Sequence, residues 1–171
     1  MTPDTAPLSN NTLAFLGLCN EFCAEVEKAP AVEMTHMVDT MLRLLPRIYI
    51  SISDAQVDFG IGEGGYISPS LEEDAYDILR ANLAVVFGEE DTFLEVFVDD
   101  MKYSDTPIAV TVSESLADLF QVFYDFLEAC RDAPNDLINE ALMSVRESFA
   151  DYWSQTLTNV LRALNAIKYR I

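Results

Sequence analysis

Several carboxylates lie close together in the middle of the sequence, and together they could bind a metal ion or attract a basic partner. The segment 95–105, EVFVDDMKYSD, includes Glu95, Asp99 and Asp105. Hard divalent cations such as Mg²⁺ and Ca²⁺ bind several oxygen ligands, and a basic protein would be drawn to the same charges. The DxDxDG spacing of an EF-hand is absent. The segment is therefore compatible with a metal site, an acidic docking surface or a solvated loop.

Polar residues also recur at helical spacing in two later segments. Glu114, Asp118, Gln121 and Asp125 step by four, three and four positions, which places them on one face of a helix. A similar stripe further on includes Asn159 and Arg162. We expect a polar cleft between these segments, formed by Glu95, Asp99, Asp105, Glu114, Asp118, Gln121, Asn159 and Arg162. If a metal ion binds there, its ligands are Asp99, Asp105, Glu114 and Asp118.

Arg162 lies in the otherwise apolar run NVLRALNAI. A guanidinium in such a run needs an acidic partner or a route to water. We expect Arg162 to pair with Asp118 or Asp105. The functional alternative is that Arg162 and the carboxylates hold a small polar ligand, Mg²⁺ or Ca²⁺ in the cleft.

The single histidine restricts the chemistry that the chain can perform. Glu33 and His36 form an ExxH pair, as in di-iron bundles, but those sites need a second such pair. Zinc sites and catalytic triads would likewise depend on His36 alone. We therefore assign no catalytic residue. The three cysteines, Cys19, Cys23 and Cys130, are too few and odd in number for a disulfide framework, and we expect free thiols packed as small apolar groups.

The overall composition predicts a folded acidic protein. Half of the 171 residues are apolar, which is enough for a sizeable core in one domain spanning residues 1–171. The net charge of −19, from 29 acids and 10 bases, argues against nucleic acid and anionic membranes as partners. The first residues, MTPDTAPLSNN, lack the features of a secretory signal, and no apolar run is long enough to span a membrane. We expect a cytoplasmic protein with a frayed lead-in at 1–10.

Apolar residues recur at three- and four-residue steps in five segments, which predicts five amphipathic helices. The predicted helices begin near Asn11, Pro30, Ser70, Ser113 and Asn135, and the last one runs to Lys168. The predicted fold class is all-α: an up-and-down helical bundle of about five helices, with an ordered acidic excursion between helices three and four.

Local signals predict several helix ends. Pro46 lacks an amide proton and should kink or end the second helix. The stretch 47–59 alternates like a strand, but we favour a last helical turn followed by a loop over a lone hairpin. Ser70 and Glu73 have the spacing of a capping box, and Ser113 is the predicted cap of the fourth helix.

Three blocks of sequence, LEVFVDDMKYSDTPI, VSESLADLFQVFYDFL and RESFADYWSQTLTNVLRAL, resemble an uncharacterised bacterial family of small all-helical domains of unknown function. Weaker similarity lies in NEFCAEVE and LLPRIYI, so the resemblance spans most of the chain. Ser154, Thr158 and Asn165 stand where the family's pattern has glycine, valine and histidine, so any chemistry of that histidine is lost here. The resemblance implies a helical, single-domain cytoplasmic protein and no particular activity.

Two functional hypotheses remain. The leading one is a small cytoplasmic helical binding or adaptor domain that engages a protein partner through an acidic surface, without a cofactor. The alternative is a protein that binds a divalent metal (Mg²⁺ or Ca²⁺) or a small polar ligand through clustered carboxylates, including a metal-dependent hydrolase. A metal site requires the carboxylates to converge on one point, whereas a docking surface leaves them in solvent beside an exposed apolar patch.

Overall fold

The computed structural model describes residues 7–55, 65–95 and 106–170. Within these ranges the chain is helical apart from one small hairpin and the connections. The elements are α1 (Asn10–Val26), α2 (Met34–Asp54), α3 (Glu73–Phe87), the 3₁₀ turn η1 (Gly88–Glu90), β1 (Thr92–Glu95), β2 (Ile108–Thr111), α4 (Val112–Cys130), α5 (Asn135–Ser148), the π-helical turn η3 (Phe149–Trp153) and α6 (Ser154–Lys168). The predicted all-α fold class is confirmed.

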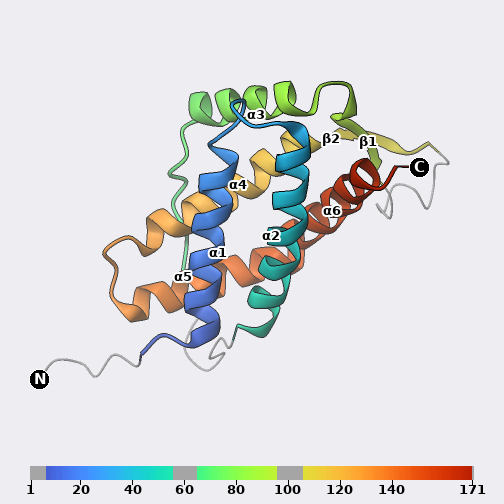
Figure 1. Ribbon diagram of the computed structural model, residues 1–171. Coiled ribbons are helices and arrows are strands. Elements are labelled where there is room, and N and C mark those ends of the chain that lie inside the picture. The colour runs from blue at the N-terminus through green and yellow to red at the C-terminus, as the bar shows by residue number, and fades with distance from the viewer. Residues whose placement is uncertain (1–6, 56–64, 96–105, 171) are drawn as a thin grey trace, which may run out of the picture.

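The helices form two layers with α3 across one end. In Figure 1, α1 and α2 run antiparallel in front of α4, and α4 runs antiparallel to the line formed by α5 and α6. The layers meet where α1 packs on α4 and α2 packs on α6. Helix α3 packs on α4, at the end of the molecule where α1 and α2 are connected. The arrangement differs from a simple up-and-down bundle because α3 crosses the end of the other helices.

Aromatic side chains fill the centre of the core. The rings of Phe15 and Phe126 lie 5.2 Å apart, and those of Phe123 and Trp153 also lie 5.2 Å apart. Trp153 is fully buried, and its indole N–H donates to the Val145 carbonyl oxygen at 2.9 Å. A buried indole needs such an acceptor. The π-helical turn that contains Trp153 divides the predicted helix 135–168 into α5 and α6.

Helix α2 passes through Pro46 and continues to Asp54. Ile48 and Ile52 are buried four residues apart, whereas Ile50 between them is 59% exposed. The apparent strand alternation at 47–54 therefore comes from the buried and exposed sides of the last two turns or so of α2. The expected loop after a single helical turn is wrong as far as Asp54, and residues 56–59 lie outside the described part of the chain.

The predicted acidic excursion begins and ends as an antiparallel hairpin. Strand β1 pairs with β2, with Thr92 opposite Thr111 and Glu95 opposite Ile108. Residues 96–105, between the strands, lie outside the described ranges. The prediction of an ordered acidic excursion did not include these two strands.

The predicted caps of two helices are corrected by the structure. Helix α3 begins at Glu73, and Ser70 does not cap it, because its hydroxyl donates to the Ser68 carbonyl oxygen instead. Helix α4 is capped by Thr111, whose hydroxyl accepts from the Glu114 amide at 3.1 Å. A serine or threonine at a helix start satisfies one of the free amides there, but several candidates in a row leave the choice to tertiary contacts.

Asp91 joins the hairpin to the start of α4. Its buried carboxylate accepts from the Ser113 amide at 2.8 Å and from the Ser113 hydroxyl at 2.7 Å. The Val112 amide donates to the Asp91 carbonyl oxygen at 2.8 Å. Ser113 is thus used to bind Asp91 rather than to cap its own helix.

We expect Asp91→Ala to lower the free energy of unfolding by about 2–4 kcal/mol, because it leaves the buried amide and hydroxyl of Ser113 without their acceptor. Urea denaturation measures this loss. Glu89→Ala, two residues away at an exposed carboxylate, should change stability by less than about 0.5 kcal/mol. Equal effects of the two substitutions would contradict the structural role of Asp91.

Candidate functional site

One half-buried carboxylate, that of Asp118, binds two tyrosine hydroxyls from different parts of the chain. Tyr76 on α3 donates to Asp118 Oδ1 at 2.5 Å. Tyr152 on the π-helical turn donates to Asp118 Oδ2 at 3.4 Å. Asp118 itself lies on α4, so this cluster ties together three elements.

The electrostatics of the cluster keep both phenols protonated. Burial raises the pKa of Tyr76, and the hydrogen bond to Asp118 and the charges of Asp118 and Glu114 raise it further. The pKa of Tyr152 is also raised, first by burial and then by the charge of Asp118. Both side chains are therefore hydrogen-bond donors at neutral pH, and neither is a base or nucleophile there.

A second carboxylate of α4 holds the start of α3. Asp125 Oδ1 accepts from the amides of Ser70 and Leu71, each at 2.9 Å. Asp118 and Asp125 are two helical turns apart, so they lie on the same side of α4, toward α3. Two members of the predicted polar stripe thus hold α3 in place. Gln121 between them is half-buried, and Glu114 is exposed.

Glu95 and Asn159 form a separate polar contact. Asn159 on α6 donates from Nδ2 to Glu95 Oε1 at 3.0 Å, and both residues are half-buried. This bond fixes the end of β1 against α6. The structure therefore joins Glu95 to Asn159, and it gathers Glu114 and Asp118 around the two tyrosines.

Arg162 does not form the ion pair with Asp118 that the sequence predicted. The side chain is exposed, and no ion pair joins it to Asp118, whose oxygens accept from the tyrosines. Pairing with Asp118 is therefore wrong, because the polar side of α6 at this position faces solvent. Asp105, the other proposed partner, lies outside the described ranges, as does Asp99.

The metal hypothesis concerns residues that the structure describes only in part. Within 7–55, 65–95 and 106–170, no group of three or more His, Cys, Asp or Glu side chains could hold a metal ion. Of the four proposed ligands, Glu114 and Asp118 are described, and Asp99 and Asp105 are not. A Mg²⁺ or Ca²⁺ site, and with it a metal-dependent hydrolase, stays a prediction.

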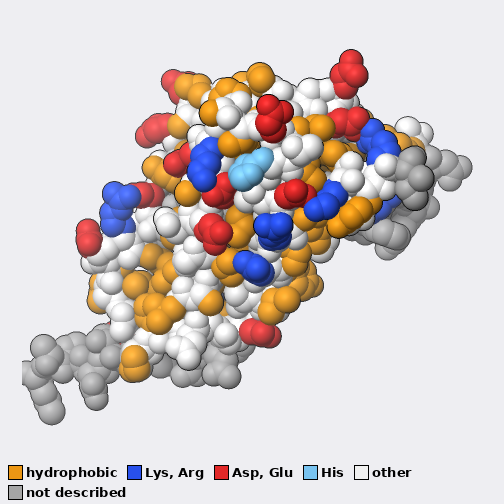
Figure 2. All heavy atoms as spheres, in the orientation of Figure 1, with side chains coloured by type: hydrophobic (Ala, Val, Ile, Leu, Met, Phe, Trp, Pro, Cys, Tyr) orange, Lys and Arg blue, Asp and Glu red, His pale blue; other side chains and the backbone are white. Residues whose placement is uncertain are grey.

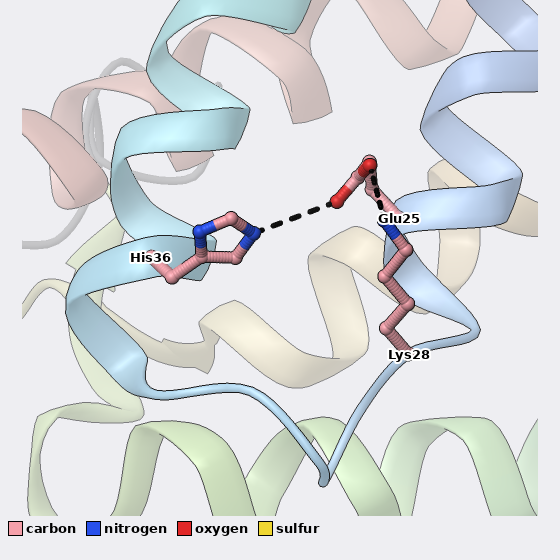
Figure 3. A network of polar contacts seen from close by, with 3 residues as sticks. All are labelled: Glu25, Lys28 and His36. Carbon is pink, nitrogen blue, oxygen red and sulfur yellow. Dashed lines mark hydrogen bonds and ion pairs between the residues drawn. The ribbon is translucent and has the colours of Figure 1, made fainter.

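His36 takes part in a surface contact between α1 and α2. Its Nε2 lies 3.7 Å from Glu25 Oε2, and Lys28 Nζ lies 2.7 Å from Glu25 Oε1 (Figure 3). The histidine of the ExxH pair is thus turned toward a carboxylate of the neighbouring helix. An exposed pair of this kind contributes at most about 1 kcal/mol to the stability of the fold.

The predicted free thiols are confirmed among the described residues. Burial is the main cause that raises the pKa of each thiol, to about 12 for Cys23 and about 11 for Cys130. Cys19 is fully buried, and its pKa is raised as well. Such thiols are protonated and unreactive at neutral pH.

Comparison with known proteins identifies the family. Residues 7–170 match the family model described as a domain of unknown function, DUF5063. The chain belongs to the DUF5063 family. A similar solved structure is the crystal structure of protein BF1032 from Bacteroides fragilis, with 31% sequence identity, 95% of each chain covered and a TM-score of 0.81. No curated protein matches the sequence.

Tyr76 and Tyr152 are the site residues that sequence reasoning missed in this DUF5063 domain. Both follow the apolar periodicity of their helices, which by itself predicts core positions. Their hydroxyls could have indicated the site, since a phenol packed against a neighbouring helix needs a polar partner.

In the described part of the chain, no helix is long and apolar enough to cross a membrane.

We expect the stability of the domain to fall as the pH rises above about 9. The pKa values of Tyr76, Tyr152, Cys23 and Cys130 are raised in the folded state. The unfolded chain therefore loses these protons first, and the stabilisation disappears as pH rises through the folded pKa values. Urea midpoints at a series of pH values measure this loss.

Tyr76→Phe should make the alkaline loss less steep, because it removes one of the groups concerned. In an Asp118→Asn background the same substitution should have a smaller effect, because the hydrogen bond and the negative charge are gone. Parallel pH profiles for the wild type and Tyr76→Phe would show that the Asp118 cluster does not contribute.

Proposed function

We propose that this DUF5063 domain is a small helical binding domain that engages a protein partner through an acidic surface on α3. The observation that carries the proposal is the outer face of this helix. Ile78 and Val85 are 63% and 71% exposed, and Ala81 between them is exposed as well. Steps of three and four residues place these side chains in one row. An apolar row in solvent is typical of a contact surface.

Carboxylates lie beside this apolar row. Asp74 and Asp77 are exposed on the same outer side of the helix, and Glu72 and Glu73 are exposed at its start. None of these four carboxylates forms an ion pair with a described residue. Their charge is therefore available to a partner. We refer to Asp74, Asp77, Ile78, Ala81 and Val85 as the α3 outer face.

Helix α3 is held firmly while this face stays open. Only Leu83 and Phe87 of the helix are buried. Its position is fixed by polar contacts to α4, through Tyr76 and Asp118 and through the amides bound by Asp125. A helix fixed on one side pays little conformational entropy when its other side binds.

The partner that fits this face has an apolar groove bordered by lysine and arginine. A net charge of −19 would speed its approach over long distances. Nucleic acids and anionic lipids would be repelled by the same charge. Binding should weaken at high salt because screening shortens the range of the attraction.

Site-specific photo-crosslinking tests the proposal. We expect a photoreactive amino acid at Ile78, in the intact chain in its native cells, to crosslink a defined protein that mass spectrometry identifies. With that protein purified, Ile78→Asp and the pair Asp74→Asn with Asp77→Asn should each lower the affinity about tenfold or more, which is about 1.4 kcal/mol.

Ile50 provides the matched control. It is 59% exposed on α2, close to the 63% of Ile78, and lies away from the α3 outer face. Ile50→Asp should leave the affinity unchanged, and a crosslinker at Ile50 should not capture the same protein. Equal capture from both positions, or an affinity insensitive to Ile78→Asp, would refute the proposal.

A further inference from the structure

A pocket of about 320 Å³ lies between the hairpin and the last turns of α6. This volume is at the lower end of the range typical of small-molecule sites. The pocket is lined by Glu90, Thr92, Phe93, Arg162, Ala163, Asn165, Ala166, Ile167 and Arg170. None of these residues belongs to the α3 outer face, so the inference is independent of the proposed function.

The pocket carries a positive charge in a strongly negative protein. Arg170 binds Glu90 through two contacts of 2.6 Å, so these two charges offset each other. Arg162 forms no ion pair with any described carboxylate, and an arginine guanidinium carries a positive charge. One positive charge therefore remains at the pocket, against a net charge of −19 for the chain.

Further basic side chains lie on α2 and near the end of α6. Figure 2 shows Lys and Arg side chains gathered from the middle of the view toward the end of α6. Lys168 on α6 binds Asp39 at 2.5 Å, and Arg43 lies close enough to lower the pKa of Asp39 as well. Two bases thus surround one acid where α2 packs on α6.

Besides the polar Thr92 and Asn165, the remaining lining of the pocket is apolar. Phe93 and Ile167 are half-buried there, and Ala163 is buried. A fully hydrated inorganic ion would gain nothing from these side chains, whereas an organic group would remove their surface from water. The lining therefore favours a ligand with one charged end and one apolar end.

We propose that this pocket binds a small organic anion, with its carboxylate or phosphate group on Arg162 and its apolar body against Phe93 and Ile167. A guanidinium presents two parallel N–H donors that match the oxygen pair of either group. Asn165 at the rim offers an amide as a further donor to the same oxygens.

Isothermal titration of the full chain with two probes tests the site and distinguishes the two head groups. The probes are phenyl phosphate and 3-phenylpropionate, with inorganic phosphate as the reference without an apolar body. We expect saturable binding of at least one phenyl probe, and at least tenfold weaker binding of inorganic phosphate. Arg162→Gln should weaken the phenyl probe at least tenfold, and Arg162→Lys should fall between, because it keeps the charge without the paired donors.

Arg47→Gln is the matched control. Arg47 is an exposed arginine of α2 that does not line the pocket, and its substitution changes the net charge equally. We expect its affinity for the probes to equal that of the wild type. In methyl NMR spectra, the δ1 methyl of Ile167 should shift with the probe, and that of the fully buried Ile48 should not.

Several results would overturn the proposal. These are the absence of saturable binding of either phenyl probe at about 10 mM, an affinity unaffected by Arg162→Gln, and an equal loss with Arg47→Gln. Binding that appears only in Asp105→Asn would overturn it too, because Arg162 would then be the partner of Asp105. Since the side chain of Arg162 is exposed, the Gln variant should keep the thermal midpoint of the wild type, and this checks that it is folded.

Discussion

The packing of α4 against four other helices is the constraint on which the rest of the structure depends. Helix α4 contacts α1, α3, α5 and α6. Its buried side chains include Phe120, Phe123 and Phe126, and the last two lie against Phe15 and Trp153. A helix surrounded to this extent has little surface left for solvent. Its carboxylates must therefore either reach the edge of the packing or find donors within it.

Asp118 and Asp125 find those donors on α3 and on the residues before it. This use of carboxylates explains how an amphipathic helix with only two buried residues stays attached. Part of the negative charge of the chain is thus structural, whereas the carboxylates on the α3 outer face are not engaged by described residues. The chain therefore has carboxylates that bond within the fold and carboxylates that face solvent, and the net charge of −19 alone does not distinguish the two groups.

Helix periodicity was sufficient to predict the fold class and most of the core, because burial of one face imposes a repeat of about 3.6 residues. Three features escaped that logic. The hairpin is short and lies beside a polar segment, so alternation had too few residues to be visible. The path of α2 beyond Pro46 depends on burial of Ile48 and Ile52 by other helices. The π-helical turn keeps an approximate helical repeat, which hides it from the sequence.

The site was predicted less well for a related reason. Spacing correctly placed Asp118, Gln121 and Asp125 on one side of a helix, but spacing within a helix carries no information about the element opposite. Tyr76 and Tyr152 lie on elements other than α4, and in the sequence they occupy positions of the apolar helical repeat. Arg162 was judged by the apolar residues around it in sequence, while the exposed side of α6 was decided by packing against α2 and α4.

The Asp91–Ser113 contact connects α4 to the segments that form the α3 outer face and the pocket. Asp91 follows η1, the turn after α3, and it lies between Glu90 and Thr92, two residues that line the pocket. By binding the start of α4 it fixes where β1 leaves the helical body, and so where Phe93 stands relative to α6. The hairpin, too small to be stable alone, is positioned at its base by this contact and at the end of β1 by the Glu95–Asn159 bond. The geometry of the pocket thus follows from the same central helix that holds α3 in place.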